Sequence, residues 1–294
     1  MFIDIHLHTV RRKSLPRNAK GDTSALPEEL IAIMDRTGVD KGVLLSGVSP
    51  ECRKQFTTVE DILDVCEQYP DRFIPFCNID PRAEGNHPQS DLSRQLLFYK
   101  GEGCKGVGEI TANLLFDDPL VQNLFTHCQA CEMPVLFHIG PQCGGCYGLV
   151  DDLHLPRLEQ CLKKFPDLIF IGHSQPFWAE ISGDLTEEAR NSYPKGKVVP
   201  QGVLVRLFEG YPNLYGDISA QSGYNALTRD AEFGFHFMET FQDRLFFGTD
   251  VTSPKNDHRH AEFLRNALQS GNISQQAFEK ISWQNTNTIL KLEL

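Results

Sequence analysis

Eight short apolar runs, separated by longer amphipathic stretches, constrain the fold of this 294-residue chain more than any other feature. The runs are five or six residues long and are bounded by Gly, Pro or Asp, as buried parallel strands are. They cover residues 2–7, 41–45, 73–77, 104–109, 134–138, 168–173, 213–217 and 245–250. The stretches between them have helical patterns, for example 27–37, 59–69, 91–99, 119–131 and 155–165, and 274–290 is expected to form a closing helix.

Eight strand–helix alternations predict an α/β fold of the (β/α)8 TIM-barrel type. No linker or low-complexity segment interrupts the pattern, so we expect one barrel domain over residues 1–294. An open doubly wound sheet is the alternative, but no GxGxxG string follows the first strand.

Composition excludes several classes of partner. The chain has 28 basic and 39 acidic residues, a net charge of −11, which disfavours binding to a nucleic-acid backbone. No run of about 18 apolar residues exists, so we expect no membrane-spanning helix. The first ten residues lack a basic start and an apolar stretch, so we expect no secretion signal and a cytoplasmic location.

Nine cysteines include two CxxC pairs, Cys128/Cys131 and Cys143/Cys146. The pairs could form a zinc ribbon, but the strand expected between them spans about 17–20 Å. We therefore expect reduced thiols, with neither a structural disulfide nor a four-cysteine zinc site. Redox pairing of Cys143 with Cys146 remains an alternative.

Polar side chains gather where the expected strands end. The residues concerned are His6, His8, Glu109, His138, His173, Asp217 and Asp250. Chemistry in TIM barrels is carried by this rim of the barrel. A single strand histidine is more often a core residue, but several strands ending in His, Glu and Asp predict a divalent-metal site.

Alternation along a strand places residues two apart on the same face. We therefore expect His6 and His8 to face the barrel axis together with Asp4. The apolar set, Ile3, Ile5 and Leu7, is expected to face the helices. The same parity groups Glu109 with Val107, His138 with Leu136, and Asp250 with Gly248 on the inner face.

Two imidazoles one strand step apart suit Zn²⁺, with Mn²⁺, Fe²⁺ or Ni²⁺ as alternatives. A divalent ion lowers the pKa of bound water from about 15.7 to about 7.

The order HxH, Glu, His, His, Asp is similar to that of the metal-dependent amidohydrolase superfamily. The strings FIDIHLH, PVLFHIG, FIGHSQP and FFGTDVTSP most resemble its amidohydrolase-related branch, which contains hydrolases and metal-dependent decarboxylases. The resemblance implies that His6, His8 and His138 are metal ligands. It implies that His173 is a second-metal ligand or a catalytic residue, and that Asp250 is a ligand that also acts as general base.

Glu109 departs from the decarboxylase pattern. Its GEI string resembles that of the TatD-like hydrolases, in which the glutamate bridges two metals. This resemblance predicts a two-metal hydrolase, while an ion-pair role for Glu109 is the alternative. The expected division is His6, His8 and Asp250 on one ion and His138 and His173 on the other.

Residues that bind the substrate are expected in the loops. The loop 9–26 carries Arg11 and Arg12 among five positive charges, and either it binds a carboxylate or phosphate or it is a solvated loop. Four loop residues that follow metal-bearing strands are expected to line the pocket: Gln142, Tyr147, Phe177 and Trp178. Plain packing is the equal alternative for Phe177 and Trp178. The histidines after the last strand, His258 and His260, are expected on the surface.

The sequence thus predicts a metal-dependent hydrolase of a small carboxylate-, ester-, lactone- or amide-bearing metabolite. A metal-dependent decarboxylase is the alternative, and a non-enzymatic metal-sensing barrel is a third hypothesis. We expect a small, anionic substrate and no nucleic-acid or membrane partner, and a homo-oligomer is compatible with the sequence.

Overall fold

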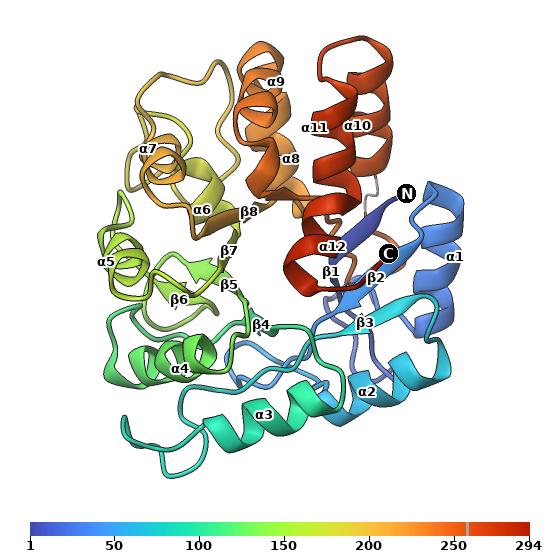
Figure 1. Cartoon of the computed structure of the whole chain (residues 1–294), viewed down its shortest axis with the longest axis vertical. Coiled ribbons are helices and arrows are strands. Elements are labelled where there is room, and N and C mark those ends of the chain that lie inside the picture. Colours follow the sequence, from blue (N-terminus) through green and yellow to red (C-terminus); the bar gives the residue numbers. More distant parts are fainter. Residues whose placement is uncertain (257–258) are drawn as a thin grey trace.

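The computed structural model describes residues 1–256 and 259–294 and contains eight parallel strands in a ring surrounded by helices (Figure 1). The strands are β1 (Ile3–Leu7), β2 (Lys41–Leu44), β3 (Phe73–Pro75), β4 (Val107–Ile110), β5 (Val135–Gly140), β7 (Phe170–His173), β8 (Leu214–Asp217) and β9 (Leu245–Phe246). A further two-residue strand, β6 (Leu149–Val150), pairs with β5 outside the ring.

Two sheets join to close the barrel. Strands β1, β2 and β3 form one sheet, and β4, β5, β7, β8 and β9 follow each other in the second. Cys77 bridges to Val107 at one junction, and Leu7 bridges to Val251 at the other. The predicted TIM barrel is confirmed, because every expected apolar run contributes one strand to the ring.

Helices form the outer layer, and their ends follow the capping signals in the sequence. Proline opens α1, α4 and α5, and the Thr58 hydroxyl accepts a hydrogen bond from the Asp61 amide at the start of α2. The helices are α1 (Pro27–Thr37), α2 (Val59–Gln68), α3 (Ser93–Gly101), α4 (Pro119–Ala130), α5 (Pro156–Lys164), α6 (Gln175–Ala179), α7 (Val203–Gly210), α8 (Ala220–Thr228), α9 (Ala231–Thr240), α10 (His260–Gln269), α11 (Gln275–Glu279) and α12 (Asn285–Leu290). None of the described helices has the length and apolar character needed to cross a membrane.

The expected closing helix is interrupted. A π-helical turn, Lys280–Gln284, separates α11 from α12, so 274–290 is not one regular α-helix. Leu290 of α12 joins the apolar cluster inside the barrel, beside Ile3 and Ile5. The segment therefore still closes the fold, as the sequence predicted.

The parity prediction for β1 is wrong in part. Ile3 and Ile5 pack inside the barrel, and only Leu7 belongs to the outer cluster under the helices. The ladder to β2 shifts register between Asp4 and Leu7, and the Asp4 carboxylate accepts a hydrogen bond from the His6 amide. Because the strand is irregular at this point, simple alternation fails across it.

The same failure occurs in β4. Val107 packs in the outer cluster, so it does not share the inner face with Glu109. The ladder to β5 shifts register between Val107 and Ile110, an interval that contains the cis Gly108–Glu109 peptide. Glu109 reaches the barrel interior because the register changes, not because of strict alternation.

All nine cysteines are free thiols. Cys128 and Cys131 lie at the end of α4, before β5, whereas Cys143 and Cys146 lie on the loop after β5. The two CxxC pairs are thus separated by β5, as the sequence indicated.

We predict that Leu136→Ala lowers the free energy of unfolding by about 2–5 kcal/mol, because Leu136 is fully buried inside the barrel and its removal leaves a cavity. Denaturant unfolding followed by circular dichroism measures the change. Leu97→Ala on α3 is the matched control, since Leu97 is 56% exposed and should change the stability by less than about 0.5 kcal/mol. Equal effects of the two substitutions would contradict the assignment of the interior core.

Candidate metal centre

His6, His8 and Asp250 converge at the end of the barrel where the strands finish. The Nε2 atoms of His6 and His8 are 3.0 Å apart, and Oδ1 of Asp250 is 3.5 Å from each. Asp250 has a φ of 56°, in the left-handed region that aspartate tolerates better than most residues, and its amide donates to the His6 carbonyl. This backbone contact places the carboxylate beside the two imidazoles.

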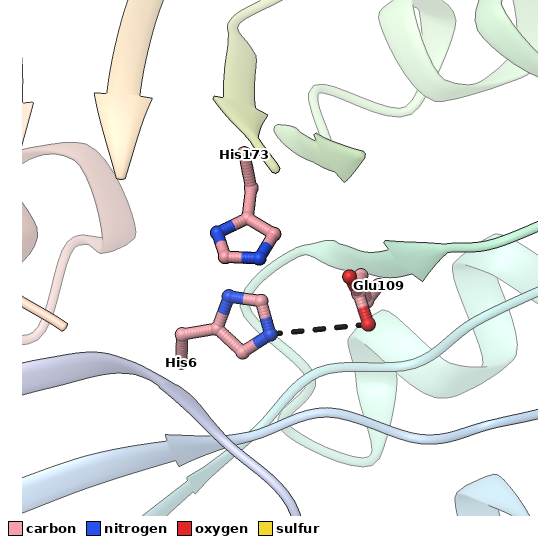
Figure 2. Close-up of side chains that lie close together, drawn as sticks. All are labelled: His6, Glu109 and His173. Carbon is pink, nitrogen blue, oxygen red and sulfur yellow. Dashed lines mark ion pairs between the residues drawn. The ribbon is translucent and has the colours of Figure 1, made fainter. Parts of the chain in front are cut away.

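Glu109 also lies beside His6, and Figure 2 shows the ion pair between the two side chains. Its Oε2 is 3.8 Å from Nε2 of His6 and 3.5 Å from Nε2 of His8. Its Oε1 contacts Nδ1 of His138 at 2.8 Å. Glu109 therefore connects the first-strand histidines with the fifth-strand histidine.

Asp217 is the residue that the sequence analysis left without a role. Its carboxylate is fully buried, and Oδ2 lies 2.6 Å from Nδ1 of His6 and 3.2 Å from Nδ1 of His173. The Ser219 hydroxyl donates to the same oxygen. A carboxylate on Nδ1 fixes the tautomer of a ligating histidine and turns its Nε2 outward. The position of Asp217 at the end of a buried strand was the sequence feature that could have indicated this role.

Trp178 contacts the backbone of Asp217 from the apolar core. Its ring is buried in the core against Phe177 and Phe237, and its Nε1 donates to the Asp217 carbonyl. Trp178 does not line the substrate cavity. It is therefore a packing residue that holds the end of β8.

The electrostatics of this cluster favour a positive charge. Burial opposes protonation of His6, but the charges of Asp250 and Asp217 outweigh it and raise the pKa of His6 to about 10. Burial and the neighbouring His6 lower the pKa of His8 to about 3. Burial would raise the pKa of Asp217, yet His6 and His173 hold it below its usual range. The negative charges of Asp217 and Asp250 thus exceed the positive charge that a protonated His6 supplies.

The donor set fits a divalent transition ion. A tetrahedral ion with bonds of about 2.0–2.1 Å places two nitrogen ligands about 3.3 Å apart, near the separation of the His6 and His8 Nε2 atoms. Among the described residues, ligand atoms within 4.8 Å of one another come from two groups. The groups are His6, His8 and Asp250, and His6, Glu109 and His173.

These groups bear on the expected division of ligands between two ions. The first matches the predicted first-ion set, but the second contains His6 again and does not contain His138. Asp217 occupies Nδ1 of His6, which leaves only Nε2 for an ion. Since both groups need that atom, the geometry favours one ion at a time.

A cavity of about 590 Å³ opens over the cluster and is lined by His8, Glu109 and Asp250. Three of the predicted substrate residues lie away from it. Arg11 pairs with Asp64 at 2.5 Å on the exposed face of α2, Arg12 is exposed outside the lining, and Gln142 is exposed on the loop after β5.

Other residues of the same loops line the cavity instead. Arg17 and Leu15 come from the basic loop, so this loop does reach the cavity, although through different side chains. Tyr147, expected at the pocket because it follows a metal-bearing strand, lines the cavity and contacts the His138 ring at 4.5 Å between centroids. Arg53 and Tyr193 also line the cavity but were not predicted. No motif marked these residues, because they belong to irregular loops.

The histidines after the last strand have different outcomes. His260 is buried, lines the cavity and contacts the Ala220 carbonyl at 2.9 Å, so its expected surface position is wrong. The prediction for His258 falls outside the described residues.

The sequence profile of the amidohydrolase family matches residues 3–292. The chain therefore belongs to the amidohydrolase family. This confirms the resemblance drawn from the strand-end motifs, and with it the prediction of a metal-dependent enzyme. Comparison with functionally curated proteins found no match.

Solved structures of the same fold extend over the whole chain. An uncharacterised TIM-barrel protein from Bordetella bronchiseptica has 18% identity and a TM-score of 0.64, with 99% of this chain and 98% of that chain covered. A probable 2-pyrone-4,6-dicarboxylic acid hydrolase from Acinetobacter baumannii has 15% identity and a TM-score of 0.59, with 99% of each chain covered. A dihydroxybenzoic acid decarboxylase from a Polaromonas species has 16% identity and a TM-score of 0.58, with 100% and 97% covered.

We predict that Asp217→Asn weakens metal binding by about 10–100-fold, because an uncharged amide oxygen is a weaker acceptor for His6 and His173 and the NH₂ group would face the Ser219 amide that now donates to Oδ1. Competition with a chromogenic chelator measures the affinity. Asp117→Asn, which removes an exposed carboxylate paired with Arg157, is the control and should bind metal like the wild type. Unchanged affinity in Asp217→Asn would show that Asp217 does not position these ligands.

Proposed function

We propose that this protein is a metal-dependent hydrolase that acts on a small carboxylate-, ester-, lactone- or amide-bearing metabolite. The observation that carries the proposal is the convergence of His6, His8 and Asp250, of which His8 and Asp250 line a cavity of about 590 Å³. Cavities of about 300–1,000 Å³ hold small molecules. We propose further that residues 1–294 act as one barrel domain in the cytoplasm.

We propose Zn²⁺ as the ion, because imidazole and carboxylate are its usual ligands in catalytic sites. His6 and His8 would hold it through Nε2 and Asp250 through Oδ1, with Glu109 next in reach. A divalent cation there would supply Lewis acidity, which polarises a carbonyl and makes water easier to ionise at neutral pH.

The chain's own groups then handle the proton. Oδ2 of Asp250 lies 3.7 Å from Nε2 of His173, on the side of the carboxylate turned away from His6. Asp217 engages Nδ1 of His173, so Nε2 is the atom left to exchange a proton or to bind the developing oxyanion. Asp250 accepts the proton of the attacking water and returns it to the leaving group.

Decarboxylation is the second candidate, and one observation favours it. His173 lies outside the group formed by His6, His8 and Asp250, so with one ion bound its Nε2 is free to protonate a carbon. Similar structures support both reactions: the Acinetobacter protein is named a probable hydrolase and contains citric acid, and the Polaromonas decarboxylase contains manganese.

We predict one equivalent of metal per chain, because both ligand groups require Nε2 of His6. Elemental analysis of protein purified without chelator, then supplied with excess Zn²⁺ or Mn²⁺, measures this number. His8→Ala should lose the ion, whereas His154→Ala, which changes a histidine paired with Glu180 away from the centre, should keep it. Two equivalents in the wild type would restore the two-metal hydrolase with Glu109 as the bridge.

We predict that His173→Gln lowers kcat by about 10²–10⁴-fold and leaves one equivalent of metal bound, since general acid–base catalysis contributes about that factor. A panel of lactones, esters, amides and aromatic carboxylates identifies the substrate. Reaction in ¹⁸O-labelled water then separates the two candidates: hydrolysis incorporates label into the product, whereas decarboxylation releases CO₂. Loss of the metal from His173→Gln would instead make His173 a ligand.

A further inference from the structure

Arg53 is held against the cavity wall by a closed loop after β2. The loop is tied at its base, where Gly47 and Thr57 exchange backbone hydrogen bonds. Nε of Arg53 donates to the Ser49 carbonyl at 3.1 Å, and Nη2 lies 3.5 Å from the Thr111 hydroxyl just after β4. The guanidinium is therefore fixed on two sides before any ligand binds.

The charge of Arg53 has no counterpart in the described part of the chain. No carboxylate lies within 4 Å of it and Nη1 has no hydrogen-bond partner there, although the side chain is half-buried and lines the cavity. Several other arginines are paired with carboxylates: Arg11 with Asp64, Arg82 with Asp80 and Glu51, and Arg157 with Asp152. A partly buried guanidinium without a partner is stabilised by an anionic ligand.

Arg53 also lies near the metal centre. Burial lowers the pKa of Arg53, while the charge of Glu109 acts in the opposite direction. Thr111, which Nη2 of Arg53 approaches, lies two positions after Glu109, and Arg17 lines the same cavity. His8, Glu109 and Arg53 line the same cavity, so one ligand bound in it can contact both His8 and Arg53.

Gly47 provides the space that the guanidinium occupies. A Cβ at this position would clash with Nη1 of Arg53 and lie 2.5 Å from its Cζ. Alanine is compatible with the backbone at Gly47, which does not have a positive φ. A single methyl group would thus displace the guanidinium without removing its charge.

We propose that Arg53, in the space left by Gly47, is the specificity-determining residue and binds a carboxylate of the substrate that is separate from the group reacting at the histidine cluster. This inference rests on the proposed function and narrows its substrate class. The substrate is a small carboxylate with a second carbonyl or carboxyl group, rather than a neutral ester, lactone or amide.

The test compares charged probes with their neutral amides on zinc-loaded protein. The probes are isophthalate against isophthalamide, and glutarate against glutaramide, titrated by calorimetry. The wild type should bind at least one dicarboxylate more tightly than its diamide. Arg53→Met should weaken dicarboxylate binding by about 10–100-fold and leave diamide binding unchanged, as expected for the loss of a charge-assisted hydrogen bond.

Three variants complete the design. Gly47→Ala should weaken dicarboxylate binding like Arg53→Met although the charge remains, and Arg53→Lys should be intermediate because it lacks the planar fork. Arg11→Met removes the same charge outside the cavity lining and should bind like the wild type. Equal losses in Arg11→Met and Arg53→Met, or a wild type that does not prefer either dicarboxylate, would overturn the inference.

The zinc content of the same samples separates this inference from the proposed function. A wild type that binds neither zinc nor manganese would refute the metal-dependent function. A wild type that binds one equivalent of zinc but prefers neither dicarboxylate would refute the role of Arg53 alone.

Discussion

The buried carboxylate of Asp217 is the interaction on which the site depends. A charge that is fully removed from water is costly unless it is paired and hydrogen-bonded, and this one contacts Nδ1 of both His6 and His173 and accepts from Ser219. Because one oxygen engages both rings, their orientations are coupled. Both present Nε2 towards the centre, where His8, Glu109 and Asp250 meet them.

The barrel supports this centre through its irregularities. In regular parallel strands the side chains alternate between the barrel interior and the helix layer. Strands β1 and β4 instead shift register where they approach the centre. The shifts free the His6 amide to bond with Asp4 and let Glu109 turn inward. Asp250, with its left-handed backbone, lies on the segment that follows β9. Local departures from ideal geometry thus gather at the functional end of the fold.

Charge is unevenly distributed around the cavity. Glu109, Asp217 and Asp250 surround the histidines at its floor, while Arg17 and Arg53 lie on its wall. This arrangement suits a cation at the floor and an anion beside it, even though the whole chain has a net charge of −11. The net charge of the chain does not indicate that two arginines line this cavity.

The sequence by itself determined the barrel and indicated most of the candidate metal ligands, because apolar runs fix the strands and parallel strand ends must meet at one rim. Tertiary structure alone decided which neighbours those residues have. His6 pairs with Asp217, which is 211 positions away in the sequence, and Arg11 pairs with Asp64, which is 53 positions away. Arg53 lines the cavity, whereas Arg11 does not. Pairings of this kind depend on how distant segments pack and on register shifts within strands, and neither leaves a periodic signal in the sequence.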